Sequence, residues 1–411
     1  MNRIVLSCLL LLAAMSTASA QTLNFNTYID SIRCRNASFL AQQLNVDISK
    51  AEVQAAHATD DPALSVEYGN NSDWNIEMGQ SVSAEISKAI APGKLAARVA
   101  VAKQQLTVSQ AESADYWRNL KADASIDFYN ALLAKELLSS DSQAYQNMAA
   151  LAASDSLRFV KGEISELDML QSRLEQYRAH QELNSKRTDY MNALLVLDQQ
   201  LGAPAQGTRA VIGSLSVPTE MFSLPQLLEH AFNSRADLVA AEQSVVLVQK
   251  EERLALKERR SDVEMALGAN YNTQVMNEEA PAPQFVGYTV GLSIPLPVAS
   301  VNAGVRKAGK LRLQQAELER QSLRNEVHGE VLRAYNVYLA SLQKVKSYSE
   351  HLMSNANKVL DGKLYAYQRG DTSLLEVLSA QHTYNEIQEE YATCLYDCMV
   401  ALAELQRSAG L

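Results

Sequence analysis

The fold is decided by residues 94–161, KLAARVAVAKQQLTVSQAESADYWRNLKADASIDFYNALLAKELLSSDSQAYQNMAALAASDSLRFVK, because these 68 consecutive residues contain neither glycine nor proline. They are rich in alanine, leucine, glutamine, lysine and glutamate, which are strong helix formers. At a rise of about 1.5 Å per residue, they predict one helix of roughly 100 Å. Residues 163–201 continue without glycine or proline after Gly162. The two stretches together predict a long antiparallel helical hairpin that turns at residues 160–163.

The same arrangement recurs in the second half of the chain, over about residues 305–361 and 371–409. The predicted tip GEISELDML at residues 162–170 matches GDTSLLEVL at residues 370–378, at an offset of 208 residues. Similarity at a fixed offset is the signature of an internal repeat. Each half of the chain is therefore expected to be one structural repeat.

Strict alternation of apolar and polar residues replaces the helical period at four places, which lie in pairs between the helices. The alternating segments are residues 64–69, 74–86, 263–271 and 286–294. Alternation over about ten residues is typical of strands with one face toward lipid, although a half-buried soluble sheet gives the same pattern. Four strands do not close a barrel, and an open sheet edge cannot face lipid, so a membrane location requires several chains to share one barrel. Three chains would supply twelve strands.

These patterns predict a mainly α protein with a small β part. Duplicated long helical hairpins would form a trimeric α-barrel, and four strands per chain would contribute to a shared 12-stranded transmembrane β-barrel. The expected organisation begins with a signal peptide at 1–20. Repeat 1 follows at 21–201, with a β-hairpin at about 62–90 and a helical hairpin at 93–201. A linker at 202–225 leads to repeat 2 at 226–411, which has a β-hairpin at about 261–297 and a helical hairpin at 304–409.

The first 20 residues have the pattern of a secretory signal peptide. Arg3 precedes an apolar run from Ile4 to Ala14, and residues 18–20 are Ala-Ser-Ala, a small-x-small cleavage site. This apolar run is shorter than the roughly 20 residues that a membrane-spanning helix needs. We therefore expect cleavage after Ala20 and export from the cytoplasm.

Three cysteines follow the predicted cleavage site, namely Cys34, Cys394 and Cys398. The last two are four residues apart on a predicted helix, so both can face the same way. Either could pair with Cys34 in an oxidising compartment. The sequence leaves open whether a disulfide forms, and it predicts no metal site.

Charge and motifs argue against a nucleic-acid-binding protein and against an enzyme. The chain has 37 basic and 47 acidic residues, a formal net charge of -10, and its basic residues are scattered. Nucleic acid is therefore not an expected partner. The six histidines show no HExxH spacing, and the chain has no GxSxG elbow and no phosphate-binding loop. We expect no catalytic, cofactor-binding or metal-ligating residues.

The order and spacing of these features resemble the TolC family of outer-membrane efflux proteins over essentially the whole mature chain. Further residues that carry the resemblance are RADL at 235–238, GLSIPL at 291–296, Arg306, and the two Gly-x-x-Ser-x-Leu-Asp/Glu-x-Leu tips. The resemblance implies a homotrimer that contacts outer-membrane lipid through its barrel and extends into the periplasm. It also implies a periplasmic adaptor protein and an inner-membrane pump of the RND type as partners, with the energy supplied by the pump.

The resemblance also assigns candidate functional residues. The adaptor-docking tips fall on Lys161, Gly162, Glu163, Ile164 and Ser165, and on Arg369, Gly370, Asp371, Thr372 and Ser373. A carboxylate ring that narrows the periplasmic end of the tunnel in the family matches Glu376, while a second acidic position one turn on is Ser379 here. Tyr367 matches a gating position, and the basic partner found there in some members is Thr372 in this chain. An ordinary carboxylate in the first turn of a helix would equally explain Glu376.

The predicted function is the passive exit duct of a tripartite efflux system in the cell outer membrane, with a large periplasmic portion. Two alternatives stay open at this point. One is a periplasmic coiled-coil scaffold or adaptor without membrane insertion, which does not explain the four alternating strands. The other is the outer-membrane duct of type I protein secretion. The sequence does not distinguish among metal cations, drugs and proteins as substrates.

Overall fold

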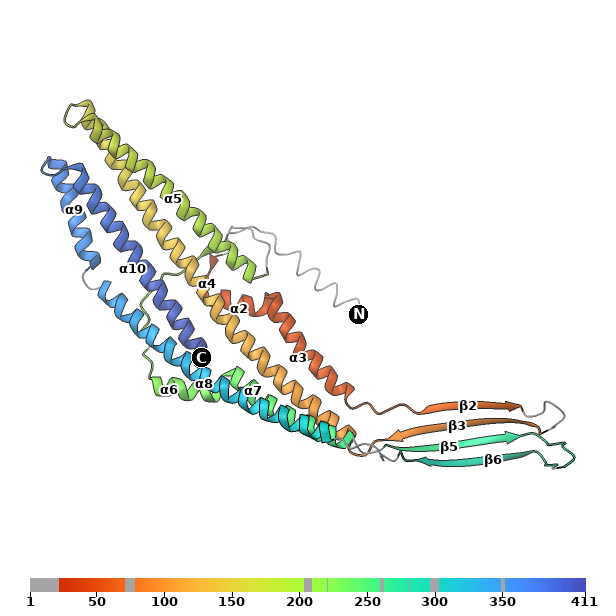
Figure 1. Cartoon of the computed structure of the whole chain (residues 1–411). Coiled ribbons are helices and arrows are strands. Elements are labelled where there is room, and N and C mark those ends of the chain that lie inside the picture. Colours follow the sequence, from red (N-terminus) through yellow and green to blue (C-terminus); the bar gives the residue numbers. More distant parts are fainter. Residues whose placement is uncertain are drawn as a thin grey trace. The chain divides into compact units, whose positions relative to one another are not determined.

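A computed structural model describes residues 22–70, 78–202, 209–219, 221–258, 262–279, 281–295, 303–348 and 352–411 (Figure 1). The predicted signal peptide, part of the predicted linker and residues 74–77 of the second predicted strand lie outside these ranges. The chain divides into two compact units. Unit 1 comprises Met1–Gln42, Ala114–Arg235 and Asn325–Leu411, and unit 2 comprises Gln43–Ser113 and Ala236–Arg324.

Unit 2 contains the β-sheet. Its strands are β2 (Ala63–Asn70), β3 (Gln80–Ile90), β5 (Val263–Asn272) and β6 (Phe285–Ser293), in the order β2-β3-β5-β6. Every neighbouring pair is antiparallel, so β3 and β5 join the hairpins of the two repeats into one sheet. Strands β2 and β6 form the two edges, and within the described ranges neither edge is paired with a further strand.

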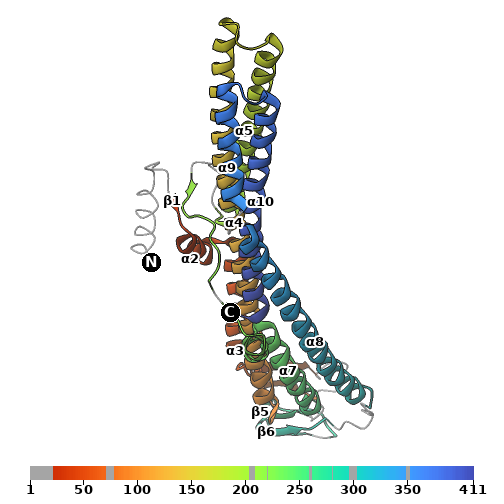
Figure 2. The same ribbon diagram turned by 90° about the vertical axis from the view of Figure 1, so that its left-hand side faces the viewer.

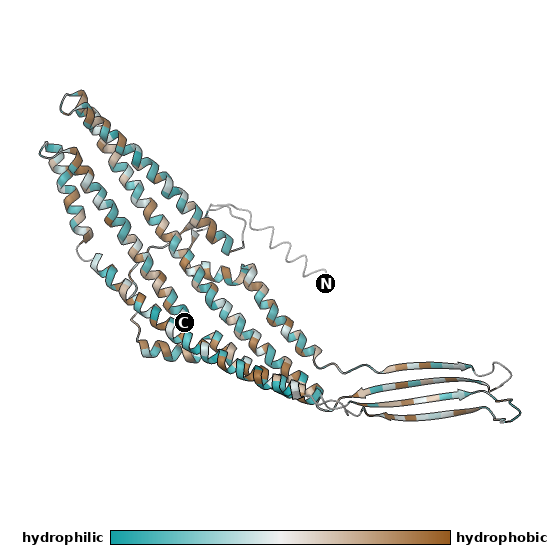
Figure 3. Ribbon diagram, in the orientation of Figure 1, coloured by the Kyte–Doolittle hydropathy of each residue, from teal (hydrophilic) through white to brown (hydrophobic). Residues whose placement is uncertain are grey.

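The register of the sheet places its apolar side chains on one face. One row across the four strands is Leu64, Ile86, Leu267 and Val290, and the row beside it on the same face is Val66, Ala84, Ala269 and Tyr288. Figure 3 shows the alternation of hydrophobic and hydrophilic residues along these strands. The apolar face is uncovered in the single chain, because Leu267 is 64% exposed and Val290 is 82% exposed. Exposed apolar area of this extent marks a surface that meets lipid or another protein.

The helices of unit 2 are α3 (Ala37–Ala55), most of which belongs to this unit, and α7 (Ala236–Glu258), with the first part of α4 (Lys94–Val160) and of α8 (Ala303–Ser347). Polar contacts between buried or half-buried side chains join them. Ser49 of α3 lies 3.0 Å from Ser109 of α4, between the two hydroxyl oxygens. The Gln104 amide of α4 donates to the Gln243 side chain of α7 over 2.8 Å.

Unit 1 contains the remaining helices. They are α2 (Phe25–Arg35), α5 (Glu166–Gln200), α6 (Leu224–Ser234), α9 (Met353–Arg369) and α10 (Leu374–Ala409), with the rest of α4 and α8. Helices α4 and α5 form one long hairpin, and α9 and α10 lie side by side as the second (Figure 2). The predicted mainly helical fold with four antiparallel strands is therefore confirmed.

The main core of unit 1 lies where α2 meets α4 and α5. Tyr28, Phe128 and Leu197 are almost completely buried there. Phe25 adds an edge-to-face contact with Phe128, with ring centroids 5.6 Å apart. A two-stranded parallel pair, β1 (Thr22–Leu23) with β4 (Ala210–Val211), ties the segment before α2 to the segment after α5. The sequence analysis did not predict this pair, because two residues are too few to show a period.

Three side chains from α4, α6 and the C-cap of α6 contact the last carbonyl groups of α10. The Arg118 guanidinium donates to the Arg407 carbonyl over 2.7 Å. Arg235 donates to the Ser408 carbonyl over 3.0 Å, and His230 Nδ1 lies 2.9 Å from the Ala409 carbonyl oxygen. The last carbonyls of a helix have no partner within the helix, and cationic groups are favoured beside them. The RADL sequence at 235–238 therefore has a structural role at its first residue.

Two boundaries differ from the sequence predictions. Of the helix expected over residues 305–361, the structure describes α8, which ends at Ser347, and α9, which begins at Met353, while residues 349–351 lie outside the described ranges. Helix α9 then continues through Gly362 to Arg369. A single glycine costs a helix only about 1 kcal/mol relative to alanine, and burial of Leu360 and Tyr367 on the same helix offsets it. In the sheet, β3 begins at Gln80, later than the alternation from residue 74 indicated.

Candidate functional site

The first hairpin tip is built from a glycine turn and a capped helix. Gly162 has a φ of +77°, which favours glycine, and the Glu163 N–H donates to the Arg158 carbonyl over 2.9 Å. Ser165 is the N-cap of helix α5, and its hydroxyl accepts from the Asp168 N–H over 3.1 Å and donates to the Asp168 carboxylate over 2.7 Å. Of the five predicted docking residues here, only Ile164 is half-buried and the others are exposed. The turn therefore presents its backbone and polar side chains outward.

The second tip repeats the turn but not the cap. Gly370 has a φ of +82°, and the Asp371 N–H donates to the Ala366 carbonyl over 2.9 Å. Ser373 stands at the N-cap of α10, yet its side chain makes no capping hydrogen bond. Arg369, Gly370, Asp371 and Ser373 are exposed, and Thr372 is half-buried. All ten predicted docking residues thus lie at the turns of the two helical hairpins.

Tyr367 connects the two hairpins just behind the tips. Its hydroxyl donates to Asp155 Oδ1 over 2.9 Å, and Asp155 belongs to α4 of the other hairpin. The Arg158 guanidinium lies over the Tyr367 ring, 4.9 Å from its centroid. Both bonded side chains are buried, Asp155 completely. Burial raises the pKa of the Asp155 carboxyl, and burial together with the bond to Asp155 raises the pKa of the Tyr367 hydroxyl.

The sequence analysis identified Tyr367 but missed Asp155, because it looked for a basic partner near residue 372. A usable signal was present, since 155 is 363 less the repeat offset of 208. Comparison of the two repeats position by position would have marked Asp155 and Lys363 as a pair of opposite charges at equivalent places.

Glu376 has a charged partner on the neighbouring helix. Its carboxylate forms an ion pair with the Lys363 ammonium of α9, and both side chains are about half exposed. The hydrogen bond from Lys363 holds the pKa of Glu376 below its usual range. Ser379 lies one turn further along α10. A groove of about 480 Å³ between α9 and α10 is lined by Lys363, Glu376 and Ser379, among others.

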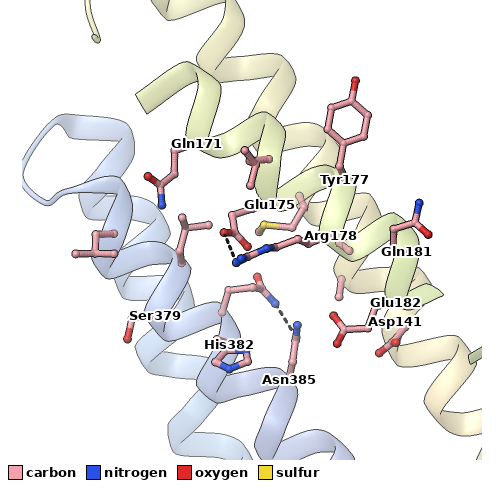
Figure 4. A pocket seen from close by; sticks show the side chains of 17 residues that line it. Asp141, Gln171, Glu175, Tyr177, Arg178, Gln181, Glu182, Ser379, His382 and Asn385 are labelled. Carbon is pink, nitrogen blue, oxygen red and sulfur yellow. Dashed lines mark hydrogen bonds and ion pairs between the residues drawn. The ribbon is translucent and has the colours of Figure 1, made fainter. Parts of the chain in front are cut away.

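A larger cavity of about 780 Å³ lies between the two hairpins of unit 1 (Figure 4). Its labelled polar side chains come from α4, α5 and α10: Asp141, Gln171, Glu175, Tyr177, Arg178, Gln181, Glu182, Ser379, His382 and Asn385. Within it, Arg178 pairs with Glu175 on its own helix over 3.1 Å. Burial raises the pKa of Asp141. The hairpins therefore flank a cavity behind the tips whose lining combines these polar side chains with apolar ones such as Met148, Leu174 and Leu378.

Lys186 joins the same hairpins further from the tips. Its ammonium lies 2.6 Å from Glu389 Oε1, which connects α5 to α10. Among the described residues, no group of three or more His, Cys, Asp or Glu side chains is placed to hold a metal ion. In the ranges that the structure covers, no helix combines the length and the apolar character needed to cross a membrane.

The three cysteines of the described chain are free thiols. Cys34 is exposed, whereas Cys394 and Cys398 are buried in α10. Burial raises the pKa of Cys398 to about 11, which leaves little reactive thiolate at neutral pH.

This arrangement predicts a labelling result. A maleimide is expected to react with one thiol per folded mature chain, Cys34, and with three after unfolding in denaturant without a reductant. Mass spectrometry counts the adducts, and Cys34→Ser, which should remove the label from the folded protein, is the control. A single adduct in the unfolded protein would instead reveal a disulfide.

Comparison with known proteins agrees with this fold. The family described as Outer membrane efflux protein matches residues 227–411. The cobalt-zinc-cadmium resistance protein CzcC of Cupriavidus metallidurans is 23% identical over 321 residues, which cover 77% of this chain and 74% of that protein. The solved structure of CusC matches with a TM-score of 0.75 at 16% identity, over 96% of this chain and 95% of that one. The outer membrane protein VceC of Vibrio cholerae matches with a TM-score of 0.72 at 15% identity, over 94% and 96% of the two chains.

The fold is thus that of an outer-membrane channel with long helical hairpins. The chain matches the outer membrane efflux protein family over residues 227–411 and is similar to CzcC over 321 residues. It is an efflux channel of the outer membrane whose helical portion lies in the periplasm, and it is a component of a tripartite efflux system. The family resemblance and the channel function predicted from the sequence are confirmed.

Proposed function

We propose that three copies of this chain form the exit duct and share one twelve-stranded barrel. The observation that carries the proposal is the sheet of unit 2, which has an exposed apolar face and two open edges, β2 and β6. Unpaired backbone groups at a sheet edge are not tolerated in lipid. Pairing of β6 in one copy with β2 in the next removes every edge, and three sheets of four strands give an even number within the range of known outer-membrane barrels.

The helical hairpins of the three copies would then surround a periplasmic tunnel. Its partners are a periplasmic adaptor protein and an inner-membrane pump of the RND type, which supplies the energy. Residues 161–165 and 369–373 are the proposed adaptor-docking surface, supported by their position at exposed helical turns. The Tyr367 to Asp155 contact is the proposed gate, because it holds the two hairpins of one copy together behind the tips. Glu376 would form the constriction.

Divalent metal cations are the proposed substrate class. Support comes from CzcC, whose name assigns it to cobalt, zinc and cadmium resistance. The chain covers most of the length of that protein, and the similarity includes more than one repeat. No observation favours drugs or secreted proteins over metal cations.

Metal tolerance of the cells tests the proposed substrate. Deletion of the gene is expected to lower the zinc, cobalt or cadmium concentration that the host tolerates, and expression of the wild-type chain should restore it. Metal accumulation measured by mass spectrometry of whole cells gives a second readout. Unchanged metal tolerance together with increased sensitivity to organic drugs would contradict metal cations as the substrate class.

Site-specific photocrosslinking tests the docking surface. A benzophenone side chain placed at Glu163 or Asp371 is expected to capture the co-expressed adaptor of the same efflux system. Gln315, an exposed residue in the part of α8 that belongs to unit 2, is a matched control position and should not capture it. Equal capture at the control position would show that the adaptor does not select the tips.

A further inference from the structure

Both tips have an acidic residue three positions after the N-cap serine, an aspartate in the first tip and a glutamate in the second. The repeat offset of 208 places Asp168 opposite Glu376 and Ser165 opposite Ser373. An acidic residue at this position commonly completes a reciprocal capping arrangement with the serine. The two tips therefore have the same sequence motif available to them.

Only the first tip uses that motif. Ser165 and Asp168 exchange two hydrogen bonds, of 3.1 and 2.7 Å. At the second tip the Ser373 side chain makes no capping bond, and the Glu376 carboxylate turns to the Lys363 ammonium on α9. The Glu376 carboxylate thus pairs with Lys363 and makes no reciprocal capping bond with the Ser373 side chain.

The position of Lys363 is itself specific to the second repeat. Its equivalent in the first repeat is Asp155, which carries the opposite charge and bonds to Tyr367. Among the ion pairs of the described residues, those of Glu376 involve Lys363 alone. The position one turn beyond Glu376, Ser379, is uncharged. The net charge at this level of α10 is therefore set by one carboxylate and one ammonium.

We infer that Lys363 sets the ionic selectivity of the periplasmic constriction by neutralising Glu376. This inference rests on the proposed function, in which three copies of Glu376 surround the tunnel. A ring of bare carboxylates attracts cations and repels anions. A ring of Lys363–Glu376 pairs presents dipoles, whose field falls off faster with distance than that of a net charge. Lys363 is thus a specificity-determining residue that acts through Glu376, and the constriction discriminates weakly between cations and anions.

The test is the reversal potential of the purified protein in planar bilayers, under a KCl gradient near 0.1 M, where charges are screened over about 10 Å. Lys363→Gln is expected to raise the ratio of potassium to chloride permeability by at least about threefold, because it leaves three uncompensated carboxylates. The double variant Lys363→Gln/Glu376→Gln should return to the wild-type ratio. Lys358→Gln is the matched control, since Lys358 is an exposed lysine on the same helix, and it should leave the ratio unchanged.

Two outcomes would overturn the inference, and they are distinguishable. An unchanged permeability ratio in a conducting Lys363→Gln channel would show that Lys363 does not mask Glu376, while the duct itself would stand. A protein that inserts in bilayers and does not conduct even as the Tyr367→Phe variant, which lacks the proposed gate contact, would contradict the proposed duct, and the inference would be wrong as well. Block by a trivalent hexammine cation from the periplasmic side gives a second readout, and Lys363→Gln should strengthen it.

Discussion

Leu267→Arg is expected to abolish assembly of the protein in the outer membrane. Leu267 lies on the inner strand β5, between Ile86 and Val290 in a cross-strand row, and its side chain is 64% exposed in the single chain. An arginine on the lipid face of an outer-membrane barrel costs about 2–4 kcal/mol at the bilayer midplane. Three copies in one barrel multiply that cost. Fractionation of the cell envelope, followed by immunodetection, measures the amount of protein in the outer membrane.

Thr289→Arg is the matched control for this variant. Thr289 lies on β6 next to Val290, but its side chain belongs to the polar face, where it stands opposite Gly268. The same charge on this face should leave outer-membrane assembly close to the wild-type level. If Leu267→Arg accumulated normally in the outer membrane, the apolar face of the sheet would not be the lipid-facing surface.

Tyr367→Phe is expected to increase the conductance of the channel by opening its periplasmic end. The variant removes the hydroxyl that donates to the buried Asp155 and leaves the aromatic ring in place. A hydrogen bond to a charged group contributes about 1.5–3 kcal/mol, which corresponds to a factor of about 10 to 150 in the equilibrium between closed and open hairpins. Single-channel recording in planar bilayers measures the open fraction and the conductance.

Tyr365→Phe controls for the loss of a tyrosine hydroxyl on the same helix. Tyr365 is 56% exposed, and its ring lies beneath the Arg369 guanidinium. The conductance of the Tyr365→Phe channel should equal that of the wild-type channel. A Tyr367→Phe channel with wild-type open fraction and conductance would mean that the contact with Asp155 stabilises the hairpins without gating them.

The long helices and the sheet could be predicted because each rests on a period that many residues share. Residues 94–160 form one helix because no glycine or proline interrupts them, and the glycines at 162 and 370 mark both turns through their positive φ angles. The sheet follows from alternation, which fixes the face of Leu64, Leu267 and their neighbours once the register is set. A period that many residues share remains recognisable even where one residue departs from it.

Features that depend on single residues were harder to predict. The continuation of α9 through Gly362 to Arg369 is decided by tertiary packing, which overrides a local preference. The partners of Tyr367 and Glu376 lie on other helices or other turns, so sequence spacing alone does not reveal them. Comparison of the two repeats marks Lys363 and Asp155 as equivalent positions of opposite charge, but only the folded hairpins show their contacts with Glu376 and Tyr367.

The proposed trimer with a shared barrel is tested most directly by the mass of the mature protein purified from outer membranes in detergent. Light scattering with the detergent contribution subtracted gives that mass. The account predicts three times the mass of one mature chain, because the edges β2 and β6 then pair between copies. A monomer that stays in solution without detergent would contradict it.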